Sequence, residues 1–325
     1  MKRKLGAMLL PWVFQVIVNA QAFHFCRSKP RENFASDYRN SDLYMTADTF
    51  QWSTRRDVRS RKRIVFIRHG RTYMNDFING IHFGQPGFTD VFPDTKEYQE
   101  KYHDSPLGPR GVEQVQLLKD RLERLYRGDV TAKEELSLTS ADASFLDDLD
   151  LIVTSPLTRA LQTMEKGLYP VIQSRNIPVV AAPQAAERLY LVSDIGKTRD
   201  ELKTRYSYVD FDSAFPPHVG ASDTWHYVAK EDEVENYVEW RPSGQGQVYA
   251  CLGEPEHCFE ERMQDLYKWL DSRPEKTIAL VCHAGVILWF LGEVVDNCDI
   301  RIIDFDGLTP KRLYEVPKDQ AALHK

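Results

Sequence analysis

Cysteine is scarce in this chain of 325 residues, which holds five cysteines and no Cys-x-x-Cys pair. Small disulfide-stapled domains carry cysteine at a much higher density, and structural zinc sites repeat paired ligands at short spacing. The cysteine pattern therefore excludes a disulfide scaffold, and it predicts no metal site. The five positions are Cys26, Cys251, Cys258, Cys282 and Cys298.

An excess of positive charge is also missing. The chain has 42 lysines and arginines against 48 aspartates and glutamates, so its formal net charge is −6. Proteins that bind nucleic acid present a basic surface, and we therefore expect no nucleic-acid partner. The total charge does not exclude a phosphorylated small molecule, because a few local arginines are enough to bind one phosphate.

The N-terminal apolar run, residues 5–18, lacks the length of a membrane span, which takes about 20 residues. It follows the cationic stretch 2–4 and precedes Ala20-Gln21-Ala22, which is the layout of a secretory signal peptide. We therefore predict a signal peptide-like leader over residues 1–22 and no stable membrane span. Ala22-Phe23 also resembles the junction in presequences for plastids of secondary origin. The predicted location is the secretory pathway or such a plastid; the alternative is a cytoplasmic protein with a leader-like N-terminus.

Residues 23–62 carry no hydrophobic periodicity and are rich in Ser, Thr and Arg, which predicts a disordered or transit-like segment. The pattern changes at residue 63, where buried-strand and amphipathic-helix patterns begin to alternate. We therefore place one folded domain at 63–317 and a short tail at 318–325.

Strand and helix patterns alternate along this domain, which favours an α/β fold. We expect a three-layer α/β/α domain with a mostly parallel central sheet. The predicted strands are 64–67, 149–153, 177–181, 277–282, 300–305 and 312–316, and the predicted helices are 111–126, 158–164, 256–270 and 285–290. Two stretches without long periodic runs, 77–104 and 191–253, are read as insertions. The longer one is aromatic and polar and predicts a lid or binding loop, or else a decorative surface insertion.

Ligands of parallel α/β sheets bind beyond the carboxyl ends of the strands. Taken alone, a histidine or an arginine after a strand is more often structural than catalytic. Here four predicted strand ends present histidines, arginines and a carboxylate to the same edge of the sheet. The segments are Arg68-His69-Gly70-Arg71-Thr72 with Asn75, Thr154-Ser155-Pro156 with Arg159, Glu187-Arg188-Leu189-Tyr190, and His283-Ala284-Gly285.

These segments, in this order, resemble the histidine phosphatase superfamily, which includes cofactor-dependent phosphoglycerate mutase. The resemblance spans roughly residues 63 to 316, with the two insertions as gaps. It implies a nucleophile at His69, a general acid and base at Glu187, and a further catalytic histidine at His283. It also implies that the transferred phosphoryl group is bound by Arg68, Asn75, Arg159 and His283.

The chemistry of these residue types agrees with that implication. A neutral imidazole can attack phosphorus, and nearby arginines keep it neutral by penalising a further positive charge. The planar guanidinium binds two phosphate oxygens at once, so the reaction needs no metal and no cofactor. We further predict that Gly70 lets the backbone approach the phosphate and that Cys282 is a buried apolar residue.

One departure from the family's mutases leaves the reaction open. Leu191 stands where those mutases carry a glycine after the tyrosine, although Arg188 and Tyr190 could still bind a substrate carboxylate or second phosphate. The sequence thus predicts a phosphatase that acts on a small phosphorylated substrate. The alternatives are a phosphoglycerate mutase-type phosphotransferase and a non-catalytic phosphate-binding protein. The oligomeric state is open.

Overall fold

The computed structural model describes residues 62–79, 96–189, 191–216, 220, 224–227, 254 and 256–305. Several predicted features lie outside these residues: the leader 1–22, nearly all of the segment 23–62, the strand 312–316, the tail 318–325 and Tyr190. Most of the region 217–253 and residues 80–95, parts of the two predicted insertions, also lie outside. None of the helices that the structure describes is long and apolar enough to cross a membrane.

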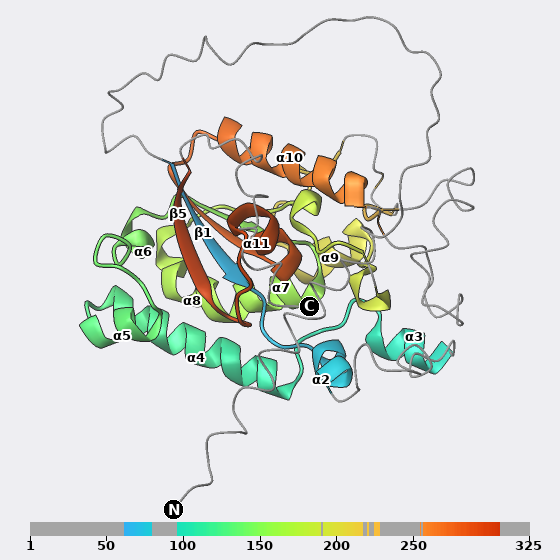
Figure 1. Cartoon of the computed structure of the whole chain (residues 1–325), viewed down its shortest axis with the longest axis horizontal. Helices are drawn as coiled ribbons and strands as arrows, with labels where there is room; N and C mark the ends of the chain where they lie inside the picture. Colours follow the sequence, from blue (N-terminus) through green and yellow to red (C-terminus); the bar gives the residue numbers. More distant parts are fainter. Residues whose placement is uncertain are drawn as a thin grey trace, which may run out of the picture. The chain divides into compact units, whose positions relative to one another are not determined.

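A five-stranded sheet forms the centre of the described domain (Figure 1). Its order is β3-β2-β4-β1-β5, and β1, β2, β3 and β4 run parallel whereas β5 is antiparallel to β1. The carboxyl ends of the four parallel strands therefore meet at one edge. The strands are β1 (Lys62–Arg68), β2 (Leu151–Thr154), β3 (Val179–Ala181), β4 (Thr277–Cys282) and β5 (Ile300–Phe305).

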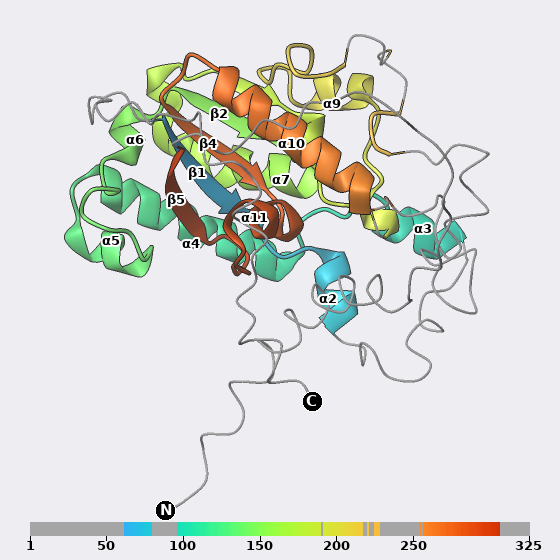
Figure 2. The same ribbon diagram turned by 45° about the horizontal axis from the view of Figure 1, so that its top comes forward.

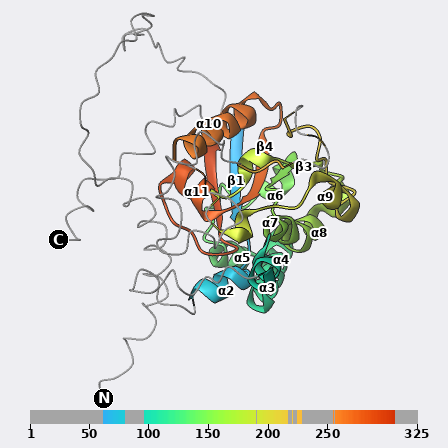
Figure 3. The ribbon, with the colours of Figure 1, turned by 90° about the vertical axis from the view of Figure 1, so that its right-hand side faces the viewer.

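Helices cover both faces of this sheet. Seen from the side, α10 and α11 lie on one side of the strands, with α4, α7 and α8 on the other (Figure 3). The α-helices are α2 (Tyr73–Asn79), α3 (Lys96–Tyr102), α4 (Pro109–Tyr126), α5 (Val130–Glu135), α6 (Phe145–Asp148), α7 (Thr158–Thr163), α8 (Tyr169–Ile172), α9 (Arg199–Arg205), α10 (Glu256–Ser272) and α11 (Ala284–Leu291). A π-helix, Met164–Leu168, joins α7 to α8, and η7 (Val192–Asp194) is a 3₁₀ turn.

Side chains alternate between two hydrophobic cores along each parallel strand, because successive strand residues point to opposite faces. In β1, Val65 and Ile67 join the core beneath α4, whereas Ile64 and Phe66 join the core beneath α10. Both faces are buried, which explains why these strands are continuous apolar runs. Figure 2 shows α10 lying across the strands on its side of the sheet.

The structure confirms the predicted α/β class and the mostly parallel sheet. It also changes some details. Lys62 belongs to β1 rather than to the unstructured segment. The two predicted insertions contain helices, because α3 falls within 77–104 and α9 within 191–253. Both helices are short and lack the long apolar period by which sequence patterns reveal a helix.

Candidate active site

His69 follows the last residue of β1, and its position fixes which ring nitrogen can react. Its Nδ1 lies 2.8 Å from the backbone oxygen of Gly70. A carbonyl oxygen can only accept, so Nδ1 carries the proton and donates it to this bond. The lone pair of the imidazole is therefore on Nε2. The side chain of Asn297 also donates to the backbone oxygen of His69, at 2.8 Å.

Burial keeps the His69 ring neutral. His69 is 4% exposed, and burial lowers its pKa well below the ordinary value, with the charges of Arg159 and Arg68 acting in the same direction. The low dielectric disfavours the imidazolium, and two neighbouring guanidinium groups disfavour it further. Nε2 is consequently available as a nucleophile over most of the physiological pH range.

His283, at the end of β4, faces His69 with ring centroids 5.0 Å apart. Arg159 Nε donates to His283 Nδ1 at 3.3 Å, so this nitrogen accepts. The proton is then on Nε2, which donates to Ser155 Oγ at 2.8 Å. The parallel pairing of β1, β4 and β2 brings His69, His283 and Ser155 together, because each directly follows its strand.

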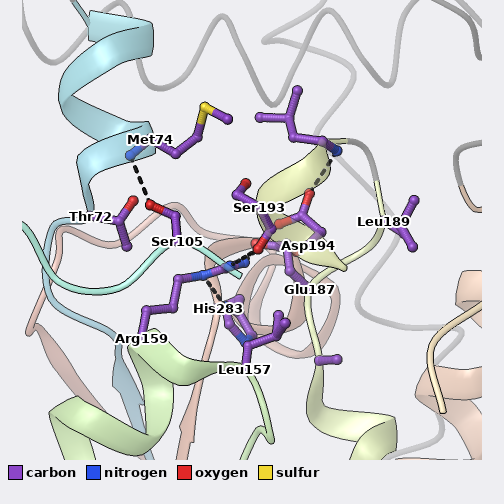
Figure 4. Close-up of polar contacts among 12 residues, drawn as sticks. Thr72, Met74, Ser105, Leu157, Arg159, Glu187, Leu189, Ser193, Asp194 and His283 are labelled. Atoms are coloured by element: carbon purple, nitrogen blue, oxygen red, sulfur yellow. Dashed lines mark hydrogen bonds and ion pairs between the residues drawn. The ribbon is translucent and has the colours of Figure 1, made fainter. Parts of the chain in front are cut away.

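Arg159 lies in the first turn of α7, and its guanidinium is buried between the strand ends and η7. Its Nη1 donates to the backbone oxygen of Ser193 at 2.6 Å, and its Nη2 pairs with Asp194 Oδ1 at 2.8 Å. Figure 4 shows this guanidinium between His283 and the turn that carries Ser193 and Asp194. The sequence predicted Arg159 in the site but not its carboxylate partner.

Glu187 reaches the same site from the segment after β3. Its carboxylate accepts from the backbone N–H of Arg188 at 3.0 Å and from that of Gly285 at 3.2 Å. Burial raises the pKa of Glu187, and the charge of Asp194 raises it further, while Arg159 and the two N–H groups oppose the change. A carboxyl group whose pKa is raised keeps its proton to a higher pH and is better suited to act as a proton donor.

Arg262 of α10 holds the backbone that carries Glu187. Its Nη1 donates to the carbonyls of Gln184 and Ala186 at 2.8 Å each, and its Nη2 donates to that of Glu187 at 3.2 Å. The other edge of the guanidinium pairs with the buried carboxylate of Glu254, at 2.8 and 2.6 Å. Three N–H groups of this arginine thus bind the segment 184–187, and the other two bind Glu254.

Arg188 follows Glu187 but its side chain enters the protein interior. It is 1% exposed, and its Nε donates to the backbone oxygen of Glu254 at 2.9 Å. Its predicted contact with a substrate remains a prediction, as does that of Tyr190, which lies outside the described residues.

Arg68, the last residue of β1, is 2% exposed and donates through Nη1 to the carbonyl of Val295 at 2.5 Å. Its Nε is buried and has no hydrogen-bond partner within the part of the chain that the structure describes. An unsatisfied buried donor costs free energy, which a bound anion would recover.

Asn75 and Gly70 have local structural roles. Asn75 Oδ1 accepts from the backbone N–H of Thr72 at 3.1 Å, and Thr72 Oγ1 accepts from that of Asn75 at 3.0 Å, so the pair stabilises the start of α2. A Cβ at Gly70 would lie 2.9 Å from Val115 Cγ2, and the Gly70 N–H donates to Thr163 Oγ1. The glycine thus permits close packing against α4. That Gly70 lets the backbone approach a bound phosphate stays a prediction. That Asn75 binds the phosphate also stays a prediction.

The structure therefore brings Arg68, His69, Arg159, Glu187 and His283 to one edge of the sheet, as predicted. Burial also raises the pKa of the Cys282 thiol, as expected of an apolar position.

Sequence reasoning missed the contacts of Asp194, Asn297 and Arg262. Asp194 had a detectable signal, because a charged residue between the apolar Val192 and Ile195 needs a partner when it is buried. No group of three or more His, Cys, Asp or Glu residues able to hold a metal occurs among the residues described.

Comparison with known proteins gives structural likeness at low identity. No protein-family model and no curated protein sequence matches the chain. The alpha-ribazole phosphatase from Shigella flexneri is 22% identical, with a TM-score of 0.37, over 74% of this chain and 90% of that one. A phosphoglycerate mutase from Thermus thermophilus is 18% identical, with a TM-score of 0.34, over 75% of this chain and 94% of that one. These two structures are among the proteins to which this chain is similar.

Proposed function

We propose that this protein is a phosphatase that hydrolyses a phosphomonoester through a phosphohistidine on His69. The observation that carries this proposal is the Nδ1 bond from His69 to the Gly70 carbonyl, which leaves the lone pair on Nε2 of a buried, neutral ring. A histidine held only for structure has no need of a lone pair next to two guanidinium groups.

In the first step, His69 Nε2 attacks phosphorus, and the bond from phosphorus to the ester oxygen breaks. Glu187 gives its proton to the leaving oxygen, so an alcohol departs and the carboxylate remains. In the second step, water attacks the phosphohistidine and transfers a proton to Glu187. Inorganic phosphate leaves, and His69 and Glu187 return to their starting states.

Positive charge for the three phosphoryl oxygens would come from Arg68 and Arg159. Arg68 Nε is a buried donor that has no partner among the described residues, and Arg159 lies against the second histidine. Phosphoryl transfer depends mainly on positioning and on charge stabilisation, and both guanidinium groups suit these tasks. We therefore propose that no metal or other cofactor takes part, and that activity survives EDTA. Loss of activity on EDTA treatment, restored by a divalent metal, would contradict this.

A mutase would use the same nucleophile and acid but would also hold a second anionic group of the substrate. Arg188, the adjacent candidate for that role, is buried with its Nε on the Glu254 carbonyl. Leu191, which stands where the family's mutases carry a glycine, favours a phosphatase over a mutase. A panel of sugar phosphates, phosphoglycerates and phosphopeptides would identify the substrate.

The nucleophile can be tested by trapping. Incubation with a ³²P-labelled substrate from that panel, followed by a quench that avoids acid, should leave label on His69, and H69A should leave none. Label on a serine or an aspartate of the wild-type protein would overturn the assignment.

The acid can be tested with leaving groups of different basicity. E187Q should slow hydrolysis of an alkyl phosphate far more than that of p-nitrophenyl phosphate, whose leaving group needs little protonation. Equal losses on both substrates would make Glu187 structural.

A further inference from the structure

Asp194 is a buried carboxylate that the proposed reaction leaves unused. Its side chain is 7% exposed, and that of its partner Arg159 is 4% exposed. A buried ion pair is costly to desolvate and is poor evidence for stability by itself. A charge that is kept at such a cost beside an arginine of the site calls for a role there.

The turn that carries Asp194 is fixed by contacts of its own. Asp194 Oδ2 accepts from the backbone N–H of Leu191 at 2.9 Å, while its Oδ1 is bound to Arg159. Val192 and Ile195 pack into a small apolar cluster with Met74, Tyr102 and Leu189. The carboxylate is therefore held in place independently of any substrate.

A second anchor holds the chain just after this turn. Lys197 Nζ pairs with the buried Asp104 at 3.1 Å and also donates to Thr158 Oγ1 at 3.2 Å. The indole of Trp225 donates to the Lys197 backbone oxygen at 2.7 Å. The turn therefore resists displacement from both sides.

The N–H donors of Arg159 can be divided into those that bind protein groups and those that remain for a phosphate. A guanidinium has five N–H groups. Three donate to His283 Nδ1, the Ser193 carbonyl and Asp194 Oδ1. One N–H of each terminal nitrogen is not used by these three bonds, so the guanidinium keeps donors from which phosphate oxygens can accept. Asp194 and Ser193 fix the orientation of the group, so these donors are held in place before a substrate binds.

We propose that Asp194 is a positioning residue, whose carboxylate orients the guanidinium of Arg159 for binding the transferred phosphoryl group. The proposal rests on the proposed function, because it assigns to Arg159 the task of binding phosphate. It goes beyond that function in naming the residue that prepares Arg159 for this task.

The same carboxylate has a second measurable effect, on Glu187. The groups that face Glu187 are Asp194 on η7, Arg159 on α7, Arg68 on β1, the Cys282 thiol on β4, and the N–H groups of Arg188 and Gly285. Among the charged neighbours, Asp194 raises the pKa of Glu187 and Arg159 lowers it. Loss of the Asp194 charge should therefore let Glu187 lose its proton at a lower pH.

The test compares D194N, which removes the charge, with D194E, which keeps the charge but displaces it by one methylene group. Both should lower kcat/KM for a hydrolysed phosphomonoester by roughly 10–100-fold, the range typical of residues that orient a directly acting group. The inhibition constant for inorganic phosphate should rise in parallel. In D194N alone, the alkaline fall of the pH profile should move to lower pH. The control D212N removes an exposed carboxylate paired with Lys203 and should behave as the wild-type protein does.

Unchanged or tighter phosphate binding in D194N would overturn the proposal, because Asp194 would then compete with phosphate for Arg159. Trapping label on His69 of the wild-type protein tests the proposed function separately. If that trapping fails, calorimetry with inorganic phosphate still decides the matter, since D194N must bind phosphate more weakly. If D194N does not fold, D194E carries the test: wild-type kinetics in that variant would also overturn the proposal.

Discussion

Gly285 gives the carboxylate of Glu187 the space that it occupies. A Cβ at position 285 would lie 2.2 Å from Glu187 Oε1, while the backbone N–H of Gly285 donates to the same carboxylate at 3.2 Å. The first turn of α11 therefore packs directly against the carboxylate of Glu187, the proposed acid. Any side chain at position 285 would displace that carboxylate.

We predict that G285A lowers hydrolysis of an alkyl phosphate by at least roughly tenfold and affects p-nitrophenyl phosphate much less, because only the first needs a well-placed proton donor. Steady-state kinetics on the two substrates would check this, with a melting curve to establish that the variant is folded. A folded G285A with an equal loss on both substrates would mean that Glu187 is not the group affected.

The pH dependence of activity should follow from two opposite pKa changes. His69 must be neutral and Glu187 protonated, yet their ordinary pKa values of 6.5 and 4.5 would leave few molecules in that state. Because burial lowers the first and raises the second, kcat/KM for an alkyl phosphate should be greatest between the two shifted values. It should fall at higher pH as Glu187 loses its proton and at lower pH as His69 gains one. In a pH profile of kcat/KM, E187Q should lose the alkaline limb. Activity that rises steeply through pH 6.5 would contradict the lowered pKa of His69.

Arg262 should matter for both stability and catalysis. Lysine has no planar fork and cannot hold the carbonyls of Gln184, Ala186 and Glu187 together with the carboxylate of Glu254. Loss of two or three partly buried bonds at about 1 kcal/mol each should lower the melting temperature of R262K by several degrees. Its kcat should fall more than its KM rises, since Glu187 is displaced while the arginines are not.

The matched control is R124K. Arg124 also bonds to several partners, including Asp129 and Glu135, but on the exposed surface, where water and salt weaken such pairs. Its melting temperature and activity should stay close to those of the wild-type protein. Equal effects in the two variants would show that the partly buried position of Arg262 is unimportant.

G70A should act through packing. Its Cβ would press on Val115 at 2.9 Å and on the backbone oxygen of Gly111 at 3.0 Å, and overpacking of this kind costs about 1–3 kcal/mol. G111A should be worse, because its Cβ would lie 1.8 Å from the Arg71 carbonyl. Melting temperatures should therefore decrease from wild type to G70A to G111A. A stable but inactive G70A would instead mean that position 70 acts on the bound phosphate.

We also propose that the N-terminal leader is removed and directs the protein into the secretory pathway or a plastid of secondary origin. The mature chain should begin near residues 20–23, or later if a transit segment is removed as well. N-terminal sequencing of protein from its native cells would check this. An intact Met1 would favour the cytoplasm.

The strand ends were predictable because a buried parallel strand is a distinct apolar run and the side chain that follows it must lie at the sheet edge. His69, Ser155 and His283 follow from that rule alone. The partner of Arg159 does not, because Asp194 lies on an irregular turn whose place depends on tertiary contacts of Val192 and Ile195. The five bonds of Arg262 likewise depend on how α10 lies against the segment 184–187, which no local pattern encodes.

Lys62 limits how far the chain can be shortened from its N-terminus. Its Nζ donates to the carbonyls of Leu270, Asp271 and Arg273, at 2.6 to 2.7 Å, where α10 ends. The first residue of β1 thus also satisfies the last carbonyls of a helix more than 200 positions away. A shortened chain that lacks Lys62 would leave the carbonyls at the end of α10 without this donor, so a stable shortened form should keep Lys62.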